Sequence, residues 1–197
     1  MNPAHKALRE RTRGAHERVD AVFAGYDLSD RAHYAAMLAA HAEVLLPLEA
    51  ALDRAGAESV TADWPERRRG AALQADLAEL AGGPAGAPPA PGAPIGTGGT
   101  PPLDTGAGAG ADQATIAGAL YVLEGSRLGG RFLARQLATG FPRRYLDADQ
   151  ARGNWPKLLS KLDAVLYEPH ALSTAVDAAL DVFEAFETAG RKWLAKV

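Results

Sequence analysis

The chain of 197 residues contains no cysteine, and this absence excludes several kinds of site. Without a thiol there is no disulfide framework, no cysteine zinc site, no iron–sulfur cluster and no cysteine nucleophile. A basic excess is also missing, because 21 Lys and Arg face 24 Asp and Glu, for a formal net charge of -3. Nucleic-acid-binding domains usually carry such an excess, so we expect no nucleic-acid partner.

Long apolar runs are missing as well. No run approaches the roughly 18 apolar residues of a transmembrane helix. Residues 1–20 are charged throughout and lack the apolar core of a signal peptide. We therefore expect a cytoplasmic protein with no membrane partner. The length and the 47% of hydrophobic residues suit one globular domain with a sizeable core.

Glycine and proline are concentrated in one segment, residues 82–111. There, 10 Gly and 7 Pro fill 17 of 30 positions. Such a composition buries too little apolar surface to offset the entropy lost on ordering. We expect a disordered, low-complexity insertion that serves as a mobile loop.

The rest of the chain has helical periodicity and no convincing strand alternation. We expect Ser29 and Asp112 to cap helices and Pro47 to kink one. The sequence thus predicts an all-α, single-domain fold, interrupted only by residues 82–111. Its helices are predicted at residues 4–23, 30–54, 66–80, 113–139, 156–167 and 172–194.

Several catalytic motifs of helical and hydrolytic enzymes are absent. No Glu-x-x-His pair is present for a di-iron bundle. His16-Glu17 is not followed by the second histidine of a zinc metalloprotease. Ser126 lacks the Gly-x-Ser-x-Gly frame of a hydrolase nucleophile.

One histidine stands in a suggestive pattern on the first predicted helix. Arg9, Thr12, Arg13 and His16 are separated by three, four and seven residues, so they share one side of that helix. A neutral imidazole there could bind a metal, most plausibly a haem iron, for which one protein nitrogen suffices. Asp20, one turn later, could accept a hydrogen bond from the second ring nitrogen. The alternative is an ordinary packed or surface histidine, as we expect for the other four histidines.

A second pattern is a glycine-rich predicted helix. Gly118, Gly125 and Gly129 fall on one side of it, although a glycine inside a helix costs about 1 kcal/mol relative to alanine. A surface without Cβ atoms lets the backbone touch a flat ligand. The alternative is close helix–helix packing through small residues.

Arginines follow on the same helix and after it. Arg127, Arg131 and Arg135 form a stripe turned away from the glycines. We expect at least two of them on a solvated face, while one at its edge could meet an acidic group of a ligand. Arg143 and Arg144 are weaker candidates for an anionic ligand.

Two segments together resemble the haem oxygenase family. Residues 8–16, with leucine, a basic residue, threonine and histidine at fixed spacings, resemble its proximal helix. Residues 121–130 resemble the distal helix of the bacterial branch associated with bacteriophytochromes. The resemblance spans the chain outside residues 82–111 and implies a haem oxygenase-like helical bundle.

The resemblance implies a role for individual residues. His16 is the expected proximal iron ligand, and Arg9 the basic residue that steers a haem propionate. Gly125 and Gly129 are expected to let the distal helix bend over the haem. Ser126 stands where many members have an aspartate that organises water, so proton delivery is the open point. The remaining candidates for haem contact are Thr12, Gly130, Arg131 and Arg135.

The implied reaction is the oxidative cleavage of haem by O2 to biliverdin, carbon monoxide and ferrous iron. Haem is then both substrate and cofactor. No flavin or nicotinamide motif is present, so electrons come from an external ferredoxin or reductase. A bacteriophytochrome apoprotein is a possible acceptor of the biliverdin. Two alternatives remain: a haem carrier or sensor without turnover, and a helical interaction domain in which His16 is merely packed.

Overall fold

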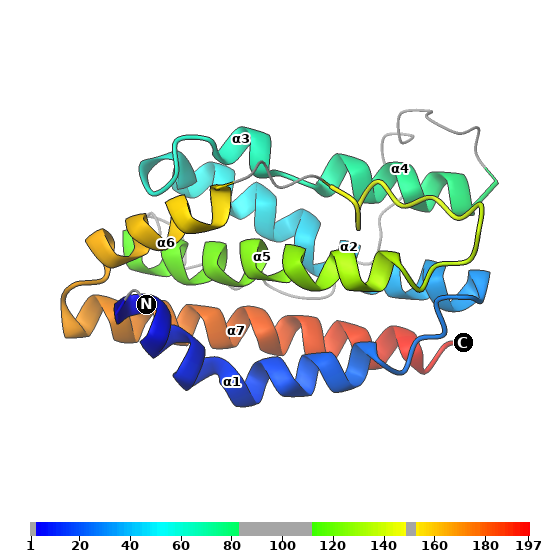
Figure 1. Ribbon diagram of the computed structural model, residues 1–197, viewed down its shortest axis with the longest axis horizontal. Coiled ribbons are helices and arrows are strands. Elements are labelled where there is room, and N and C mark those ends of the chain that lie inside the picture. The colour runs from blue at the N-terminus through cyan, green and yellow to red at the C-terminus, as the bar shows by residue number, and fades with distance from the viewer. Residues whose placement is uncertain (1–2, 83–111, 149–152) are drawn as a thin grey trace.

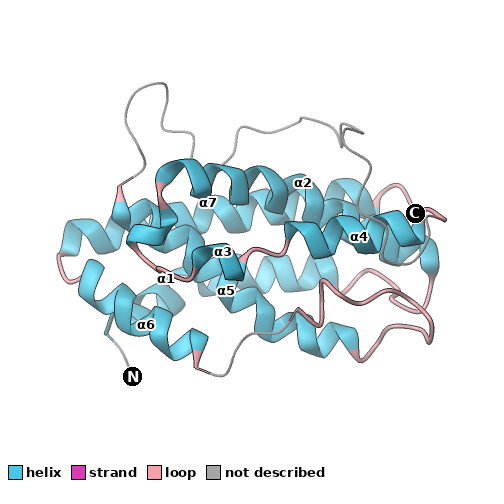
Figure 2. Ribbon diagram, turned by 90° about the horizontal axis from the view of Figure 1, so that it is seen from above, coloured by secondary structure: helices cyan, strands magenta, loops and turns pink. Residues whose placement is uncertain are grey.

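The computed structural model describes residues 3–82, 112–148 and 153–197. Every regular element in these ranges is a helix (Figures 1 and 2), which confirms the predicted all-α class. The predicted disordered insertion lies outside the described residues, except for Gly82 at its start. The elements are α1 (Pro3–Phe23), α2 (Arg31–Ala55), the 3-10 turn η1 (Ala57–Ser59), α3 (Trp64–Arg67), α4 (Gly70–Leu80), α5 (Gln113–Ala134), α6 (Asn154–Val165) and α7 (Pro169–Leu194).

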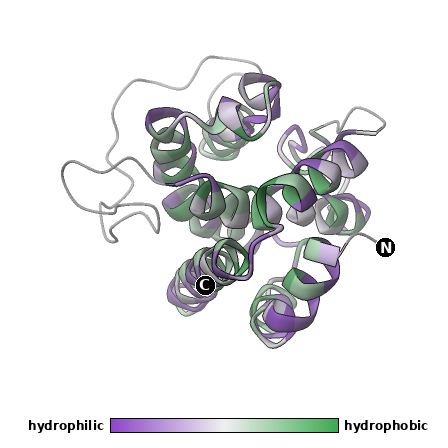
Figure 3. Ribbon diagram, turned by 90° about the vertical axis from the view of Figure 1, so that its left-hand side faces the viewer, coloured by the Kyte–Doolittle hydropathy of each residue, from purple (hydrophilic) through white to green (hydrophobic). Residues whose placement is uncertain are grey.

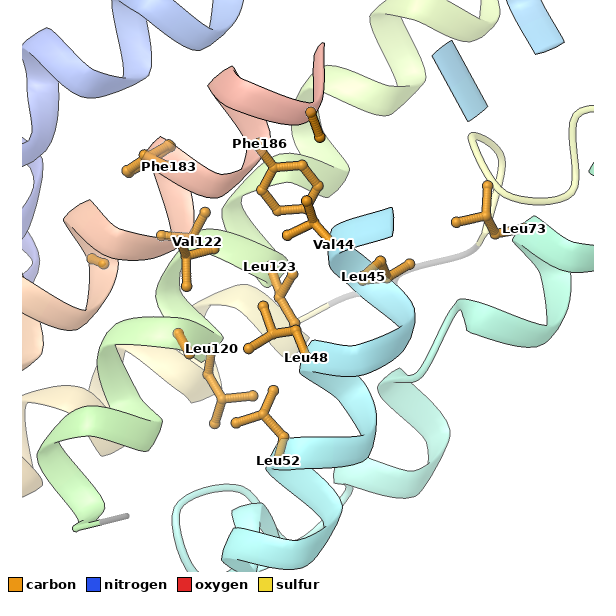
Figure 4. Packing of buried hydrophobic residues seen from close by; sticks show 14 of the residues in the cluster. Val44, Leu45, Leu48, Leu52, Leu73, Leu120, Val122, Leu123, Phe183 and Phe186 are labelled. Carbon is orange, nitrogen blue, oxygen red and sulfur yellow. The ribbon is translucent and has the colours of Figure 1, made fainter. Parts of the chain in front are cut away.

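Helix α7 is the common packing partner of α1, α2 and α5. In Figure 1 it runs between α5 and α1 along the long axis of the bundle. Apolar side chains of α2, α5 and α7 meet in the interior (Figure 4), where Leu48, Leu120 and Val182 have no exposed surface. Seen end-on, hydrophobic residues turn inward and hydrophilic residues outward (Figure 3). Burying one leucine-sized side chain contributes roughly 1.5–3 kcal/mol, so this core holds the central helices together.

Two helix starts can be compared with the predicted caps. Asp112 caps α5 as predicted, with its carboxylate accepting the Thr115 N–H at 2.7 Å. Ser29 was the wrong residue for α2, which is capped by the next residue, Asp30. The Ser29 hydroxyl donates instead to the Asp27 carboxylate, at 2.6 Å. Helix α2 continues through Pro47.

The predicted helix at 66–80 is wrong, because the chain breaks it into α3 and α4. Glu49 of α2 causes the break by accepting the backbone N–H groups of Arg69 and Gly70, at 2.7 and 3.0 Å. Those N–H groups begin α4 and are satisfied by a carboxylate from another helix. The break places the Arg69 side chain against α5.

The other boundaries differ by a few residues. Helix α5 ends at Ala134 rather than near residue 139, and Arg143 donates to the Ala134 carbonyl at 2.8 Å. Helix α6 starts two residues early, after Gly153 in the left-handed region (φ 97°), and ends at Val165. Helix α7 starts at Pro169, where a missing N–H costs nothing.

One helix among the described residues, α2, is long and apolar enough to cross a membrane by length and composition alone. Core helices pass the same test, and 61% of its most apolar window is buried inside the bundle. We therefore interpret α2 as a core helix.

Candidate functional site

His16 lies near the middle of α1, with its ring over the edge of Phe183 from α7 (ring centres 5.7 Å apart). Its Nδ1 atom lies 3.0 Å from Oδ2 of Asp20, as the spacing predicts. An ionised carboxylate only accepts hydrogen bonds, so Asp20 favours a proton on Nδ1, and in the neutral ring Nε2 is then the nitrogen open to a ligand. The His16 side chain is 59% exposed. A neutral imidazole with an accessible Nε2 is suited to ligate a metal.

A contact between α1 and α5, one helical turn before His16, shows which residue of α5 lies level with His16. The side chains of Thr12 and Tyr121 meet between α1 and α5. Both helices run in the same direction in Figure 1, and an α-helix rises about 1.5 Å per residue. His16 and Gly125, each four residues after that contact, therefore lie at about the same height.

Beyond this height, one face of α5 is uncovered. Leu128 and Phe132 are 56% and 65% exposed, although both are large and apolar. They lie within about 60° of Gly125 around the helix, at 100° per residue. A Cβ atom on Gly129 would have nothing within 4 Å. We call Leu128, Gly129 and Phe132 the open face of α5.

This open face and the His16 side of α1 belong to helices that both pack on α7 but make few contacts with each other. An exposed apolar face usually marks a binding site. Helix α1 therefore offers a nitrogen ligand, and α5 offers apolar side chains and bare backbone. This combination of groups suits a flat, apolar ligand with a metal at its centre.

The glycines of α5 have different neighbours. Gly118 packs so closely on α7 that a Cβ atom there would overlap the Ala175 carbonyl. Close helix packing therefore explains this glycine, but not Gly129. Gly125 is intermediate, because its missing Cβ would lie 3.6 Å from the Trp155 ring of α6.

The residues around Trp155 close one end of the site. Trp155 lies near His5 of α1 and Tyr121 of α5, with ring centres 5.7 and 6.0 Å apart. Burial, with Arg9 as a smaller cause, lowers the pKa of His5, which favours its neutral form. Burial raises the pKa of the Tyr121 phenol, and the Thr12 hydroxyl opposes this. Both rings are therefore neutral at pH 7.

Comparison with known proteins identifies the family of this chain. Residues 2–191 match the family model described as Heme oxygenase. The chain belongs to the haem oxygenase family. A heme oxygenase of Xanthomonas campestris pv. campestris (strain 8004) is 30% identical over 161 residues, which cover 79% of this chain and 87% of that protein. The structure of heme oxygenase from Leptospira interrogans matches the fold with a TM-score of 0.67 at 18% identity, over 98% of this chain and 100% of that one.

In this member of the haem oxygenase family, two hydrogen bonds hold the Ser126 hydroxyl. The Ser126 hydroxyl donates to the Leu123 carbonyl at 2.7 Å and accepts from Arg69 at 2.9 Å. Backbone bonds of this kind often bend a helix. The structure thus gives Ser126 a fixed hydroxyl and a cationic neighbour.

The predicted haem contacts on α1 and at Gly130 have different surroundings. Arg9 is exposed, two turns before His16. Thr12 is buried, and its hydroxyl donates to the Leu8 carbonyl at 2.8 Å, so it joins the two walls. Gly130 is buried on another side of α5, where a Cβ atom would lie 3.3 Å from the Leu146 carbonyl oxygen.

The arginine stripe divides in two. Arg131 and Arg135 are exposed, in line with the expected solvated face. Arg127 is buried and binds the Glu124 carboxylate at 2.8 Å and the Arg67 carbonyl. Arg135 lies about 80° from Gly125 around the helix and is the arginine of the stripe nearest to the open face.

The predicted anion site at Arg143 and Arg144 is not supported, because carboxylates already hold both residues. Arg143 pairs with Asp147 at 2.6 Å. Arg144 pairs with Asp76 at 3.0 Å and with Glu79 at 2.8 Å. Arg144 thus attaches the segment after α5 to α4, whereas Arg143 binds within that segment and to the end of α5.

The sequence contained a signal for some of the residues that were missed. Leu128 and Phe132 are three or four residues from Gly125 or Gly129. A helical-wheel projection would therefore have placed all four on one face. Arg69 had no such signal, because its position depends on the break between α3 and α4. Glu124 binds Arg67 at 2.7 Å, across 57 residues of sequence, which no local pattern announces.

Proposed function

We propose that this chain cleaves haem oxidatively to biliverdin, carbon monoxide and ferrous iron, with His16 as the proximal iron ligand. The observation that supports this most directly is the Asp20–His16 pair, which leaves Nε2 available at the height of the distal glycines. Membership of the family places the chain among haem-degrading enzymes. Haem is the substrate and also supplies the iron at which O2 reacts.

The residues of the chain have separate tasks in this proposal. Nε2 of His16 binds the iron, while Asp20 holds the ring in one tautomer and orientation. Leu128 and Phe132 exclude water from the porphyrin face, and Gly129 admits close contact with the backbone. Arg9 binds the haem propionates at one end of the site, through charge-assisted ion pairs. Arg135 or Arg131 does so at the other end.

Proton supply falls to Ser126 in this proposal. Its hydroxyl is fixed by Leu123 and Arg69 and retains one free lone pair, which can accept a hydrogen bond from a water molecule. Thr12 and Gly130 support the site by packing. Electrons come from an external ferredoxin or reductase. The cytoplasmic location and a bacteriophytochrome apoprotein as biliverdin acceptor belong to the same proposal.

Mixing the purified chain with haemin and then with a reductant under air tests this function. We expect a Soret shift on binding, followed by loss of the Soret band and growth of biliverdin absorbance. A stable Soret band would instead identify a haem carrier or sensor. No spectral change would leave a helical domain in which His16 has no ligand role.

The ligand assignment is tested with the His16→Ala variant. We expect it to lose the spectrum of a histidine-ligated haem and to regain it when free imidazole is added. His170→Ala is the matched control, because His170 is exposed at the start of α7. An unchanged spectrum in His16→Ala would show that another residue binds the iron.

A further inference from the structure

Arg69 carries a positive charge into the interior beside α5. The residue is 6% exposed. One guanidinium nitrogen, Nη2, donates to the Leu123 carbonyl at 3.0 Å and to the Ser126 hydroxyl at 2.9 Å. The guanidinium carbon lies 5.0 Å from the centre of the Tyr145 ring. All three partners are neutral.

The charge of Arg69 differs from that of the neighbouring buried arginines. Arg67 and Arg127 both pair with Glu124, at 2.7 and 2.8 Å. Within the described part of the chain, no carboxylate lies within ion-pair distance of the Arg69 guanidinium, although the Glu49 carboxylate interacts with its charge at longer range. The Glu49 carboxylate is occupied by the backbone N–H groups at the start of α4. Burying a charge without an ionic partner costs free energy, which points to a use for it.

The partners of Arg69 indicate where its charge acts. Leu123 comes two residues before Gly125 and Ser126 directly after it, and Ser126 is itself exposed. The Ser126 hydroxyl donates to Leu123 and accepts from Arg69, so it can offer only its remaining lone pair. The guanidinium therefore acts through this hydroxyl, next to Gly125 in the sequence of α5.

We propose that Arg69 is a positioning residue of the distal wall: it fixes the Ser126 hydroxyl and selects small anions as ligands beside Gly125 and Gly129. This inference rests on the proposed haem site. Neutral ligands of the same iron gain nothing from the buried charge. Selection between anionic and neutral ligands is therefore the property that a merely structural arginine would not confer.

The test uses the ferric haem complex of the full chain. Fluoride and azide serve as anionic probes and imidazole as the neutral probe, each titrated by absorbance at pH 7. Arg69→Gln removes the charge and leaves a shorter, neutral donor, whereas Arg69→Lys keeps the charge. Arg68→Met is the matched control, because Arg68 is the adjacent residue and pairs with Asp53 at the surface (2.9 Å).

We expect Arg69→Gln to weaken fluoride and azide binding about tenfold, as for loss of a unit charge within ~10 Å at an effective dielectric constant of about 20. Arg69→Lys stays within about threefold of the original chain, and imidazole affinity changes little in either variant. Equal losses for anions and imidazole, or no loss for anions, would overturn the role of Arg69. If Arg69→Gln does not fold, a tenfold loss of anion affinity in Arg69→Lys overturns it. Absence of haem binding by the original chain would overturn the proposed function as well, and is seen before any variant is made.

Discussion

A histidine on the surface of a helix ligates a metal well only when its second ring nitrogen is held. In this chain the holder is Asp20, one turn along α1, and the two side chains are 59% and 67% exposed. Neither residue is needed for the core. In the proposed function, their pairing serves ligand binding rather than folding.

The Asp20→Asn variant separates these two effects. We expect haem affinity to fall by about tenfold or more, the range for loss of a carboxylate that supports a metal ligand. The melting temperature of the haem-free protein should hardly change. Haemin titration and thermal denaturation measure the two quantities. Glu17→Gln on the same exposed side of α1 is the control, and an equal loss of affinity there would refute a special role for Asp20.

For individual residues, the sequence predicts contacts only between side chains on the same helix. The His16–Asp20 pair was predictable because a spacing of four residues fixes both side chains on one side. The partner of Ser126 was not, since Arg69 is 57 residues away and reaches it only after α4 has been placed. Ser126 could be identified as unusual, but the cation behind it could not.

Among the elements, α5 combines two uses of glycine in one helix. Gly118 lies against the Ala175 backbone of α7, and Gly129 lies on the open face. The same substitution at the two positions should therefore have opposite consequences.

We expect Gly118→Ala to destabilise the protein by about 2 kcal/mol or more, because the extra methyl group meets backbone that cannot move aside. Gly129→Ala should keep or raise the stability by up to about 1 kcal/mol through helix propensity. It should weaken haem binding about tenfold, or about 1.4 kcal/mol, because the methyl group projects from the open face. Urea denaturation and haemin titration of both variants measure this. Unimpaired haem binding by Gly129→Ala would place the ligand elsewhere.

The helix boundaries show what local sequence specifies. Asp112 caps α5 through a contact within three residues, so the start of α5 was predictable. The division between α3 and α4 depends on Glu49, which lies 20 residues before Arg69. The hydrophobic periodicity alone predicts one helix that continues across residues 68 and 69. It contains no information about a carboxylate contributed by α2.

For the whole molecule, a buried histidine makes stability depend on pH. Burial, assisted by Arg69, lowers the pKa of His41 from 6.5 to about 3. Among the described residues, its ring forms a hydrogen bond with the Tyr145 hydroxyl at 2.7 Å and packs against Phe23 and Phe186. Between these pKa values the unfolded chain binds a proton that the folded chain does not. Stability is therefore full above about pH 6.5 and falls as the pH drops toward 3.

We expect the free energy of unfolding to fall by about 2 kcal/mol from this residue between pH 7 and pH 5. His41→Gln should remove most of that slope, while the exposed His170→Gln should retain it. Urea denaturation at the two pH values measures the difference. Carboxylates with low pKa values, such as Asp63 at about 2, contribute only at more acidic pH. A slope that survives in His41→Gln would assign the pH dependence to other groups.

Because α7 (Pro169–Leu194) carries both walls of the site, the order of synthesis matters. The ribosome releases α1 and its histidine first, and the helix on which α1 rests last. The apolar side of α1 therefore has no α7 to pack against until residues up to 194 have left the ribosome.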